Sequence, residues 1–513
     1  MGKILGLRAR WWILLAFILI PLILIGVLVW ELMSSDIQAR YLAKTAAKMT
    51  WKVQEGPSER IRFPQGGPYD QRLGYSKLPD YTRRLAVRGW EVERQAKISI
   101  QMERAHDLGL NLPYREKNQG GLTLLDDAGN PLYESRYPAR VYASFADTPP
   151  VLRKSLLFIE NRELLSEQFP SKNPAVEWDR LGQALLDKFY SMINPAHNVP
   201  GGSTLPTQIE KYRHSPDGIT LSMTDKLRQM GSASLRAYLD GENTLPTRQR
   251  IVRDYLNTVP LSAAPRFGEV NGVGDGLWAW YGLDFDKANA ALWRLEKNPR
   301  DIEGAMVFKH VLSPLVAERK PSHYLARDRA ALDRYTNVHL DLLAEAGLIA
   351  PELREAALKI KLRSPKQRVD PPPPMFVMQK AATSQRVRLA SLLGESRLYD
   401  LDRLDLVAQG TLNGEAQRQV TEFLLGLSQP RKAAALGLYG ERLMTSANDL
   451  SKVVYSFTLY EKSPQGMLLR VQADNLNQPF DINQQTKLDL GSTAKLRTLV
   501  TYLEIIARLH AEY

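Results

Sequence analysis

The chain has 513 residues, 44% of them hydrophobic, and no cysteine. It can therefore bury the cores of several domains, while disulfide frameworks, cysteine zinc ribbons and thiol nucleophiles are excluded. Its net charge of +12 comes from 68 basic and 56 acidic residues that are scattered without a long Lys/Arg block. Such a charge suits an anionic membrane surface or an anionic substrate at least as well as nucleic acid. Because no basic patch is interleaved with aromatic residues, we expect no nucleic-acid partner.

An uncharged apolar run lies near the N-terminus. Trp11 to Trp30 are twenty consecutive uncharged residues, mostly Leu, Ile and Val, long enough to cross about 30 Å of hydrocarbon as a helix. Lys3, Arg8 and Arg10 precede the run, which places the N-terminus in the cytoplasm and the chain after about residue 31 outside. The alternative is a cleaved signal peptide, whose apolar region is usually only about 7 to 15 residues long. We therefore expect residues 1–34 to form a cytoplasmic tail and a single transmembrane anchor.

Residues 35–147 are expected to form an N-terminal extracytoplasmic region with a small β module. The anchor helix should continue into water to about Lys52, and a proline- and glycine-rich stretch up to Pro79 then predicts extended chain without helix. A short edge strand is expected at residues 61–63. Further on, two apolar runs flank an Asp/Gly/Asn turn, which predicts a β-hairpin over residues 121–132.

Residues 148–362 are expected to form a mostly α-helical domain, because apolar stripes at helical spacing alternate with Gly or Pro breaks. The helices are predicted at Val151 to Glu163, Trp178 to Ile193, Met223 to Asp240, Pro246 to Asn257, Phe285 to Glu296, Tyr324 to Ala346 and Pro351 to Ile360.

A stiff linker over residues 363–375 follows, because Pro371 to Pro374 is an uninterrupted proline run. Residues 376–513 then have a mixed pattern. Strands are predicted at residues 404–408, 453–459 and 467–471, and a terminal helix at residues 493–511.

Two segments of the helical domain could carry chemistry together. Glu160 ends the apolar run of residues 156–159, and the turn Gly201-Gly202-Ser203-Thr204 precedes Gln208 and Lys211. Taken singly, a glutamate at this place is typical of a solvated helix end and the turn is typical of a surface loop. As a pair, they supply a carboxylate that can take a proton and a cation that can hold a phosphate. A sugar transfer from a diphosphate carrier requires both.

The pair resembles the glycosyltransferase domain of the bifunctional peptidoglycan synthases, which are class A penicillin-binding proteins of glycosyltransferase family 51. In that family an apolar helix ends in Glu-Asp-x-x-Phe-x-x-His, and Gly-Gly-Ser-Thr-x-Thr-Gln-Gln with a Lys three residues on follows. Glu160 matches the catalytic glutamate of the first motif. Gly201, Gly202, Ser203, Thr204, Gln208 and Lys211 match the second motif. Further similar segments, at residues 250–257, 267–274 and 312–314, extend the resemblance over about residues 120–362.

The resemblance implies a lysozyme-like α-helical fold that polymerises lipid II into glycan strands with release of undecaprenyl diphosphate. Glu160 would be the general base in an inverting transfer. The substrate-binding residues would be Arg162, Ser203, Thr204, Gln208, Lys211 and Arg228, of which Lys211 and Arg228, with Arg162, would hold the diphosphate. No cofactor is implied, although a divalent cation (Mg or Mn) is compatible. The implied partners are lipid II, the growing glycan strand, the membrane and other cell-wall synthesis proteins, and the implied location is the bacterial inner membrane with the catalytic part in the periplasm.

The chain departs from the family pattern in its acidic residues. Asn161, Leu164 and Glu167 replace the Asp, Phe and His of the first motif. The family's second essential glutamate, in an Arg-Lys-x-x-Glu motif, falls on Ser232 in one register and on Gln229 in the other. A lipid II-binding scaffold without activity is therefore an open alternative. A membrane-anchored interaction module unrelated to glycans is a third.

A second motif lies near the end of the chain. Ser492-Thr493-Ala494-Lys495 is a Ser-x-x-Lys pattern, which also occurs where a serine simply caps a helix. After a glycosyltransferase domain and a linker it resembles the start of an α+β penicillin-binding transpeptidase domain, with Ser492 as the nucleophile and Lys495 as its activating partner. The chain stops 18 residues after Lys495 and contains no Lys-Thr-Gly. We therefore expect residues 376–513 to be a partial domain, cut from a longer parent protein and without transpeptidase activity.

Overall fold

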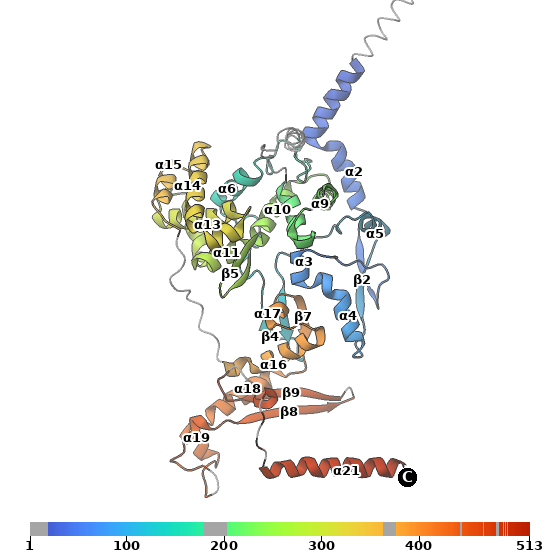
Figure 1. Ribbon diagram of the computed structural model, residues 1–513, viewed down its shortest axis with the longest axis vertical. Coiled ribbons are helices and arrows are strands. Elements are labelled where there is room, and N and C mark those ends of the chain that lie inside the picture. Colours follow the sequence, from blue (N-terminus) through green and yellow to red (C-terminus); the bar gives the residue numbers. More distant parts are fainter. Residues whose placement is uncertain are drawn as a thin grey trace, which may run out of the picture. The chain divides into compact units, whose positions relative to one another are not determined.

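The computed structural model describes residues 19–178, 203–362 and 376–512, except for residues 442–443, 465, 479–481, 486, 488 and 490. These residues are mostly helical, with small sheets of two or three strands, as the sequence predicted (Figure 1). They divide into two compact units. The first unit consists of the described parts of residues 1–122, 135–369 and 390–406, and the second of residues 123–134, 370–389 and 407–513.

The apolar N-terminal segment is a bent pair of helices. The helix Leu19–Ser34 and α2 (Asp36–Ala46) meet at 56°, at Ser35, whose φ is 58°. Among the described residues no single helix is long and apolar enough to cross a membrane, although the bent pair passes by length and composition. Residues 11–18 of the predicted anchor lie outside the described residues, so the anchor stays a prediction.

The rest of the N-terminal region combines a two-stranded sheet with short helices. β1 (Trp51–Glu55) pairs antiparallel with β2 (Arg94–Ile98). The helices are α3 (Pro68–Leu73), α4 (Leu78–Ala86) and α5 (Ile100–Asp107). Two predictions are wrong here: residues 61–63 form no strand, and α3 and α4 lie where proline was expected to prevent helix. Proline stands within the first two residues of both helices, where its missing N–H costs no intrahelical bond.

The predicted helical domain is confirmed in the first unit. Its helices are α6 (Pro150–Glu160), α8 (Leu205–His214), α9 (Met223–Ala237), α10 (Leu245–Thr258), α11 (Gly272–Tyr281), α12 (Phe285–Arg294), α13 (Ile302–Ala317), α14 (Arg329–Glu345) and α15 (Pro351–Leu358), with the strands β5 (Pro260–Ala264) and β6 (Gly268–Asn271) between α10 and α11. The helix predicted from Val151 ends at Glu160 instead of Glu163. The helix predicted at Trp178 to Ile193 lies outside the described residues beyond Trp178. The one predicted from Tyr324 starts as a π-helical turn, Ser322–Arg327, and continues as α14.

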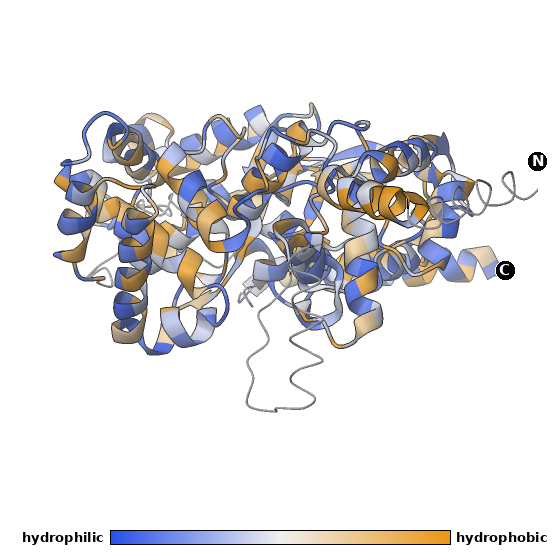
Figure 2. Cartoon of the chain, turned by 90° about the horizontal axis from the view of Figure 1, so that it is seen from above, coloured by the Kyte–Doolittle hydropathy of each residue, from blue (hydrophilic) through white to orange (hydrophobic). Residues whose placement is uncertain are grey.

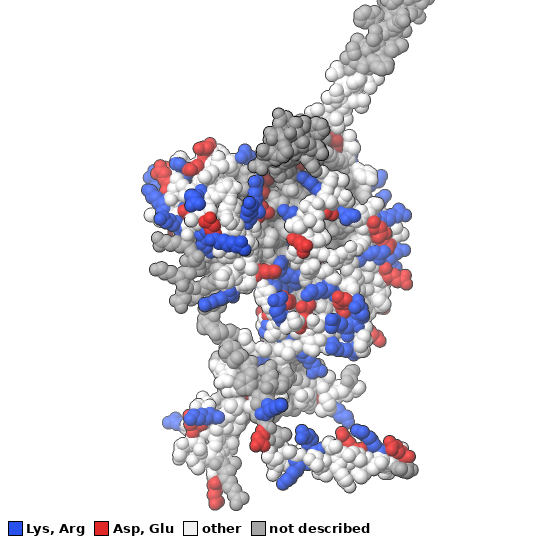
Figure 3. All heavy atoms as spheres, viewed as in Figure 1, with Lys and Arg blue, Asp and Glu red and all other residues white. Residues whose placement is uncertain are grey.

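Three helices of this domain, α8, α11 and α13, are not among the predicted helix ranges. α11 begins in a glycine-rich stretch, where a Cβ on Gly272 would stand 2.3 Å from the carbonyl oxygen of Asn257. α13 contains Pro314 and is apolar on all sides, because it lies at the centre of the core and packs against α6, α11, α12, α14 and α15. Many helices carry both hydrophobic and hydrophilic residues (Figure 2). On the face drawn in Figure 3, Lys and Arg are interspersed with Asp and Glu.

The second unit is smaller and mixed. The predicted hairpin is present as β3 (Gly121–Leu125) and β4 (Pro131–Glu134), which form a sheet with β7 (Asp405–Gln409). β8 (Ser456–Ser463) pairs antiparallel with β9 (Gly466–Asp474). The helices of this unit are most of α16 (Phe376–Leu393), α18 (Gly414–Gly426), α19 (Pro430–Ala435), the short α20 (Ile482–Gln485) and the exposed terminal helix α21 (Ala494–Glu512). The last residues of α16 and the short α17 (Leu398–Leu401) belong to the first unit. The predicted strands and terminal helix are thus present within a few residues. The linker at 363–375 lies outside the described residues, and the predicted domain limits stay predictions.

Candidate functional site

Glu160 is held by a chain of two hydrogen bonds. It is the last residue of α6, and its Oε2 accepts from Nε2 of Gln208 at 2.8 Å. Oε1 of Gln208 accepts in turn from the buried hydroxyl of Tyr255 on α10 at 3.2 Å. Burial raises the pKa of Tyr255 well above 10, and the charges of Glu318 and Glu160 raise it further. Because Tyr255 stays a neutral donor, it turns the amide so that the NH₂ group faces the carboxylate of Glu160.

The predicted turn is described from Ser203 onward. Ser203 is half-buried, and Thr204 caps α8 through a capping box with Thr207. The hydroxyl of Thr204 is buried and donates to the carbonyl of Ala175 at 3.2 Å, so it is used within the protein. Gly201 and Gly202 lie outside the described residues.

Lys211 follows Gln208 by three residues on α8, which places both on the same face of the helix. It is half-buried. Its charge lowers the pKa of Glu318, a carboxyl group that also interacts with Glu160. Glu160, Gln208 and Lys211 therefore share one site.

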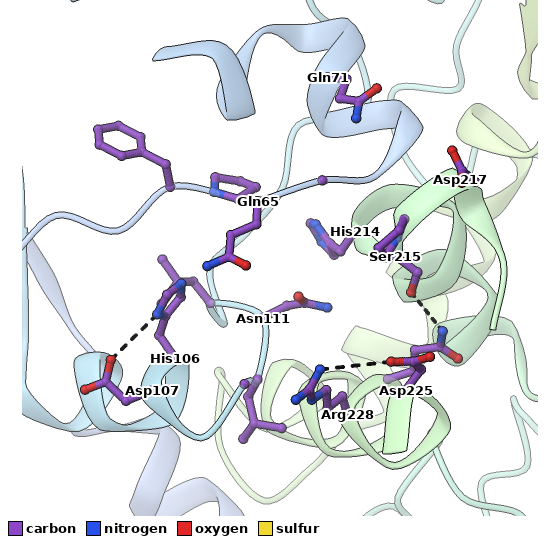
Figure 4. A pocket seen from close by; sticks show the side chains of 18 of the residues that line it. Gln65, Gln71, His106, Asp107, Asn111, His214, Ser215, Asp217, Asp225 and Arg228 are labelled. Atoms are coloured by element: carbon purple, nitrogen blue, oxygen red, sulfur yellow. Dashed lines mark hydrogen bonds and ion pairs between the residues drawn. The ribbon is translucent and has the colours of Figure 1, made fainter. Parts of the chain in front are cut away.

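The other two predicted cations lie elsewhere. Arg162 is exposed, donates to the carbonyl of Phe158 at 3.2 Å and stacks on its ring at 4.1 Å. Arg228 lines a polar cavity of about 740 Å³ together with residues that include His106, Asn111 and Gln229. Figure 4 shows Arg228 directed toward Asp225, 4.0 Å away. The ion pair of Arg228 is with Asp225, and its assignment to the diphosphate stays a prediction.

At both candidate positions of the family's second glutamate, Gln229 and Ser232, the side chain is engaged in hydrogen bonds within the protein. Gln229 donates to Ser215 at 2.8 Å, the dashed line at Ser215 in Figure 4, and accepts from Thr220 at 3.1 Å. The hydroxyl of Ser232 accepts from the backbone N–H of Asn111 at 2.9 Å. Both side chains are buried and tie neighbouring loops to α9.

A comparison with protein families decides what this domain is. Residues 128–331 match the family model described as Transglycosylase. The chain contains a transglycosylase domain. The match covers Glu160, Gln208, Lys211 and Tyr255, and it confirms the predicted glycosyltransferase family 51 domain. The protein matches none of the curated proteins.

Within the transglycosylase domain, the loop after Glu160 is fixed by an arginine that sequence reasoning missed. Arg248 on α10 is 1% exposed. Its guanidinium donates to the carbonyls of Leu164 and Ser166 at 3.2 and 2.9 Å, and to those of Phe169 and Pro170 at 3.0 and 3.1 Å. Nothing in the local pattern of α10 distinguishes this arginine from the exposed ones beside it.

Replacement of Arg248 by Lys is expected to lower the free energy of unfolding by about 1–3 kcal/mol, because an ammonium cannot reach four carbonyl groups and leaves some of them buried without a donor. The glycosyl-transfer rate should fall as well, since the loop that follows Glu160 loosens. Urea denaturation and a polymerisation assay measure the two effects. Arg250→Lys, at a partly exposed pair with Asp240, is the control and should change little. If Arg248→Lys left both the free energy of unfolding and the glycosyl-transfer rate unchanged, Arg248 would not be the residue that fixes this loop.

A buried ionic network joins the N-terminal region to the transglycosylase domain. Glu116 contacts His214 of α8 and pairs with Arg213 of α8 at 3.0 Å and Arg236 of α9 at 2.9 Å. His214 also contacts Asp70 of α3 at 2.6 Å. Sequence reasoning missed this network because its acids lie far from α8 and α9 along the chain. Asp70 and Glu116 thus fix the C-terminal end of α8, the helix that carries Gln208 and Lys211.

Burial and charge oppose each other in this network. Burial raises the pKa of Glu116, but the charges of Arg236, His214 and Arg213 outweigh it and hold that pKa well below 4.5. Burial lowers the pKa of His214, but the carboxylates of Glu116 and Asp70 outweigh it and raise that pKa to about 10. Both groups are therefore charged at neutral pH.

Across the described residues, no group of three or more His, Asp or Glu side chains is arranged to hold a metal ion.

Proposed function

We propose that this protein polymerises lipid II into glycan strands and releases undecaprenyl diphosphate. The observation that carries the proposal is the hydrogen bond from Gln208 to Glu160, on the helix that also presents Lys211, inside a transglycosylase domain. Peptidoglycan glycosyl transfer follows from the family, and the donor, acceptor and roles of the residues are the proposal.

In the proposed reaction, the carboxylate of Glu160 takes the proton of the 4-hydroxyl on the GlcNAc of lipid II. The oxygen then attacks the anomeric carbon of the growing strand with inversion, and the bond from that carbon to the diphosphate breaks with its electron pair on the leaving oxygen. Lys211 stabilises the charge that develops on the diphosphate. Gln208 keeps the carboxylate turned toward the acceptor, which shortens the search for a reactive geometry.

The test is to incubate the detergent-solubilised protein with labelled lipid II and to separate the products on a gel. Detergents should be varied, and Mg²⁺ and Mn²⁺ should be added or withheld to test for a divalent ion. A ladder of glycan products is expected. No product under any of these conditions would reject the proposal.

The second candidate function is a lipid II-binding scaffold. The observation that favours it is that both positions of the family's second glutamate hold neutral side chains, Gln229 and Ser232, that are engaged in the protein's own hydrogen bonds. The same incubations distinguish the two functions, because a scaffold would retain labelled lipid II without lengthening it.

We also propose that residues 1–34 anchor the protein in the bacterial inner membrane with residues 35–513 in the periplasm, where lipid II, the glycan strand and other cell-wall synthesis proteins are its partners. The flanking basic residues and the exposed apolar helix from Leu19 support this. A phosphatase fused at about residue 380 should be active only outside the cytoplasm. An inactive fusion, or mature protein without residues 1–30, would reject the anchor.

We propose that residues 1–513 by themselves form little or no penicillin acyl-enzyme, whereas a chain that continues beyond residue 513 should label at Ser492. Ser492 and Lys495 are both exposed, with Nζ of Lys495 at 3.5 Å from the hydroxyl of Ser492. The 513 residues contain no Lys-Thr-Gly after Ser492, so the strand that completes the oxyanion hole and holds the substrate carboxylate is not among them. Labelling with a fluorescent penicillin should therefore stay at the level of a Ser492→Ala control. Strong labelling that disappears in that control would contradict the expectation.

A further inference from the structure

A second cavity lies on the far side of α8 from Gln208 and Lys211. It has a volume of about 310 Å³ and is lined by residues of α8, α9 and α10 and by residues 114–116 of the N-terminal region. On α8 the lining residues are Pro206, Ile209, Glu210 and Arg213. With about 3.6 residues in a helical turn, these four lie on the face opposite to Gln208 and Lys211. The cavity is therefore separate from the proposed reaction centre.

The cavity combines an apolar floor with a charged mouth. Five buried side chains form the floor: Pro206, Ile209, Ala233, Ala237 and Ile251. Arginines and acids complete the lining, and the most exposed of them is Arg115, whose side chain is 70% exposed. A cavity of this size and lining suits a small ligand with an apolar body and a charged end.

Most charges in the lining are compensated within the protein. Arg253 pairs with Asp254 at 2.6 Å. In the buried network at the end of α8, three cations are balanced by three acids, namely Arg213, Arg236 and His214 by Asp70, Glu116 and Glu210. These groups therefore add no net charge to the cavity.

One positive charge remains at the mouth. Arg115 and Arg250 both pair with Asp240, which lies beside the cavity, so two guanidinium groups share one carboxylate. Each uses its Nη2 atom for this contact, and in the part of the chain that the structure describes their Nε and Nη1 groups form no further hydrogen bond. The lining and its ion-pair partners thus keep one uncompensated positive charge, with N–H groups that can still donate.

We propose that this cavity binds a single carboxylate attached to a small apolar group, as at the C-terminus of a peptide or in a short organic acid. The carboxylate accepts from the guanidinium groups of Arg115 and Arg250, and the apolar group covers the floor. A phosphate monoester fits less well, because it brings up to about two negative charges where the site has one to compensate.

A ligand in this cavity would contact two helices that position the proposed catalytic groups. α8 carries Gln208 on its other face, and α10 carries Tyr255, whose hydroxyl orients the amide of Gln208. Occupancy should therefore stabilise the packing of α8 on α10. The inference goes beyond the proposed function and does not depend on it, because binding can be measured without lipid II.

The test titrates the detergent-solubilised 513-residue chain with N-acetyl-alanyl-leucine, which ends in a free carboxylate, and with its C-terminal amide. Calorimetry should show that the amide binds about tenfold more weakly or not at all, because it lacks the charge. At about ten times its Kd the acid should raise the Tm by about 2–5 °C. Isovalerate distinguishes the two sources of the carboxylate: an affinity equal to that of the peptide indicates an organic acid, and a lower one a peptide C-terminus.

Two substitutions should shift the affinity for the acid in opposite directions. Arg115→Gln removes the uncompensated charge and should weaken binding about tenfold, whereas Asp240→Asn leaves two cations without a counter-charge and should tighten it. Arg300→Gln is the matched control, because it changes the net charge as Arg115→Gln does, at an exposed pair with Glu352. It should bind the acid like the wild type.

Four results would overturn the inference: no measurable binding of the acid, equal affinity for the acid and the amide, tighter binding of inorganic phosphate than of the acid, or a wild-type affinity in Arg115→Gln. Each of them would leave the proposed glycosyl transfer untouched, since that activity is measured separately with lipid II.

Discussion

Replacement of Glu160 by Gln is expected to reduce the polymerisation of lipid II on the order of 10²-fold or more, because the amide cannot take the proton of the acceptor hydroxyl. The geometry should survive. The amide oxygen of the new side chain can still accept from Nε2 of Gln208, which Tyr255 keeps in the donating orientation. Binding of lipid II should therefore remain near the wild-type level. A gel assay measures the rate, and retention of labelled lipid II measures the binding.

The matched control is Glu163→Gln, three residues further along the chain. Glu163 pairs with Lys172 and is 65% exposed, so its loss should leave the rate unchanged. If Glu160→Gln kept half of the wild-type rate, Glu160 would not be the base. If both variants lost activity equally, the loop conformation rather than proton transfer would be responsible.

Replacement of Glu116 by Gln is expected to lower the free energy of unfolding by about 3–5 kcal/mol, because it leaves buried cations without their counter-charge. Arg213 and Arg236 both pair with Glu116, and His214 contacts it as well. An amide of the same size keeps the packing, so the loss measures the charge. Urea or thermal unfolding at pH 6 gives the value. Glu352→Gln, at an exposed pair with Arg300, should leave the midpoint unchanged.

The same network predicts a dependence of stability on pH. The folded-state pKa of Glu116 is lowered, so its contribution is present above about pH 4.5 and is lost as pH falls through the lower folded value. The folded-state pKa of His214 is raised from 6.5 to about 10, so its contribution is complete below about pH 6.5 and is lost as pH rises through about 10. This part of the stability should therefore be greatest between about pH 5 and 6.5. Glu116→Gln should flatten the acidic side of the curve, and an unchanged curve would contradict the network.

Local sequence patterns predicted most helices of the described part of residues 148–362 within a few residues. α9, α10, α12 and α15 each carry an apolar stripe on one face, which is the pattern that a half-buried helix requires. The pattern was not informative for α13, because a helix that packs against neighbours on all sides shows no single apolar stripe. It also missed α3 and α4, because proline stands within the first two residues of each, where a helix tolerates it.

The sequence by itself determined the family, through Glu160 and the residues that follow Ser203, because the spacing of these motifs along the chain can be compared directly. It could not determine which charged groups surround them. The tertiary structure decided that Lys211 shares a site with Glu160 whereas Arg228 lines a different cavity. It also brought Glu116 into contact with the C-terminal end of α8. The physical reason is that these contacts join helix ends and loops far apart along the chain, so they depend on how α6, α8, α9 and α10 pack and not on any local propensity.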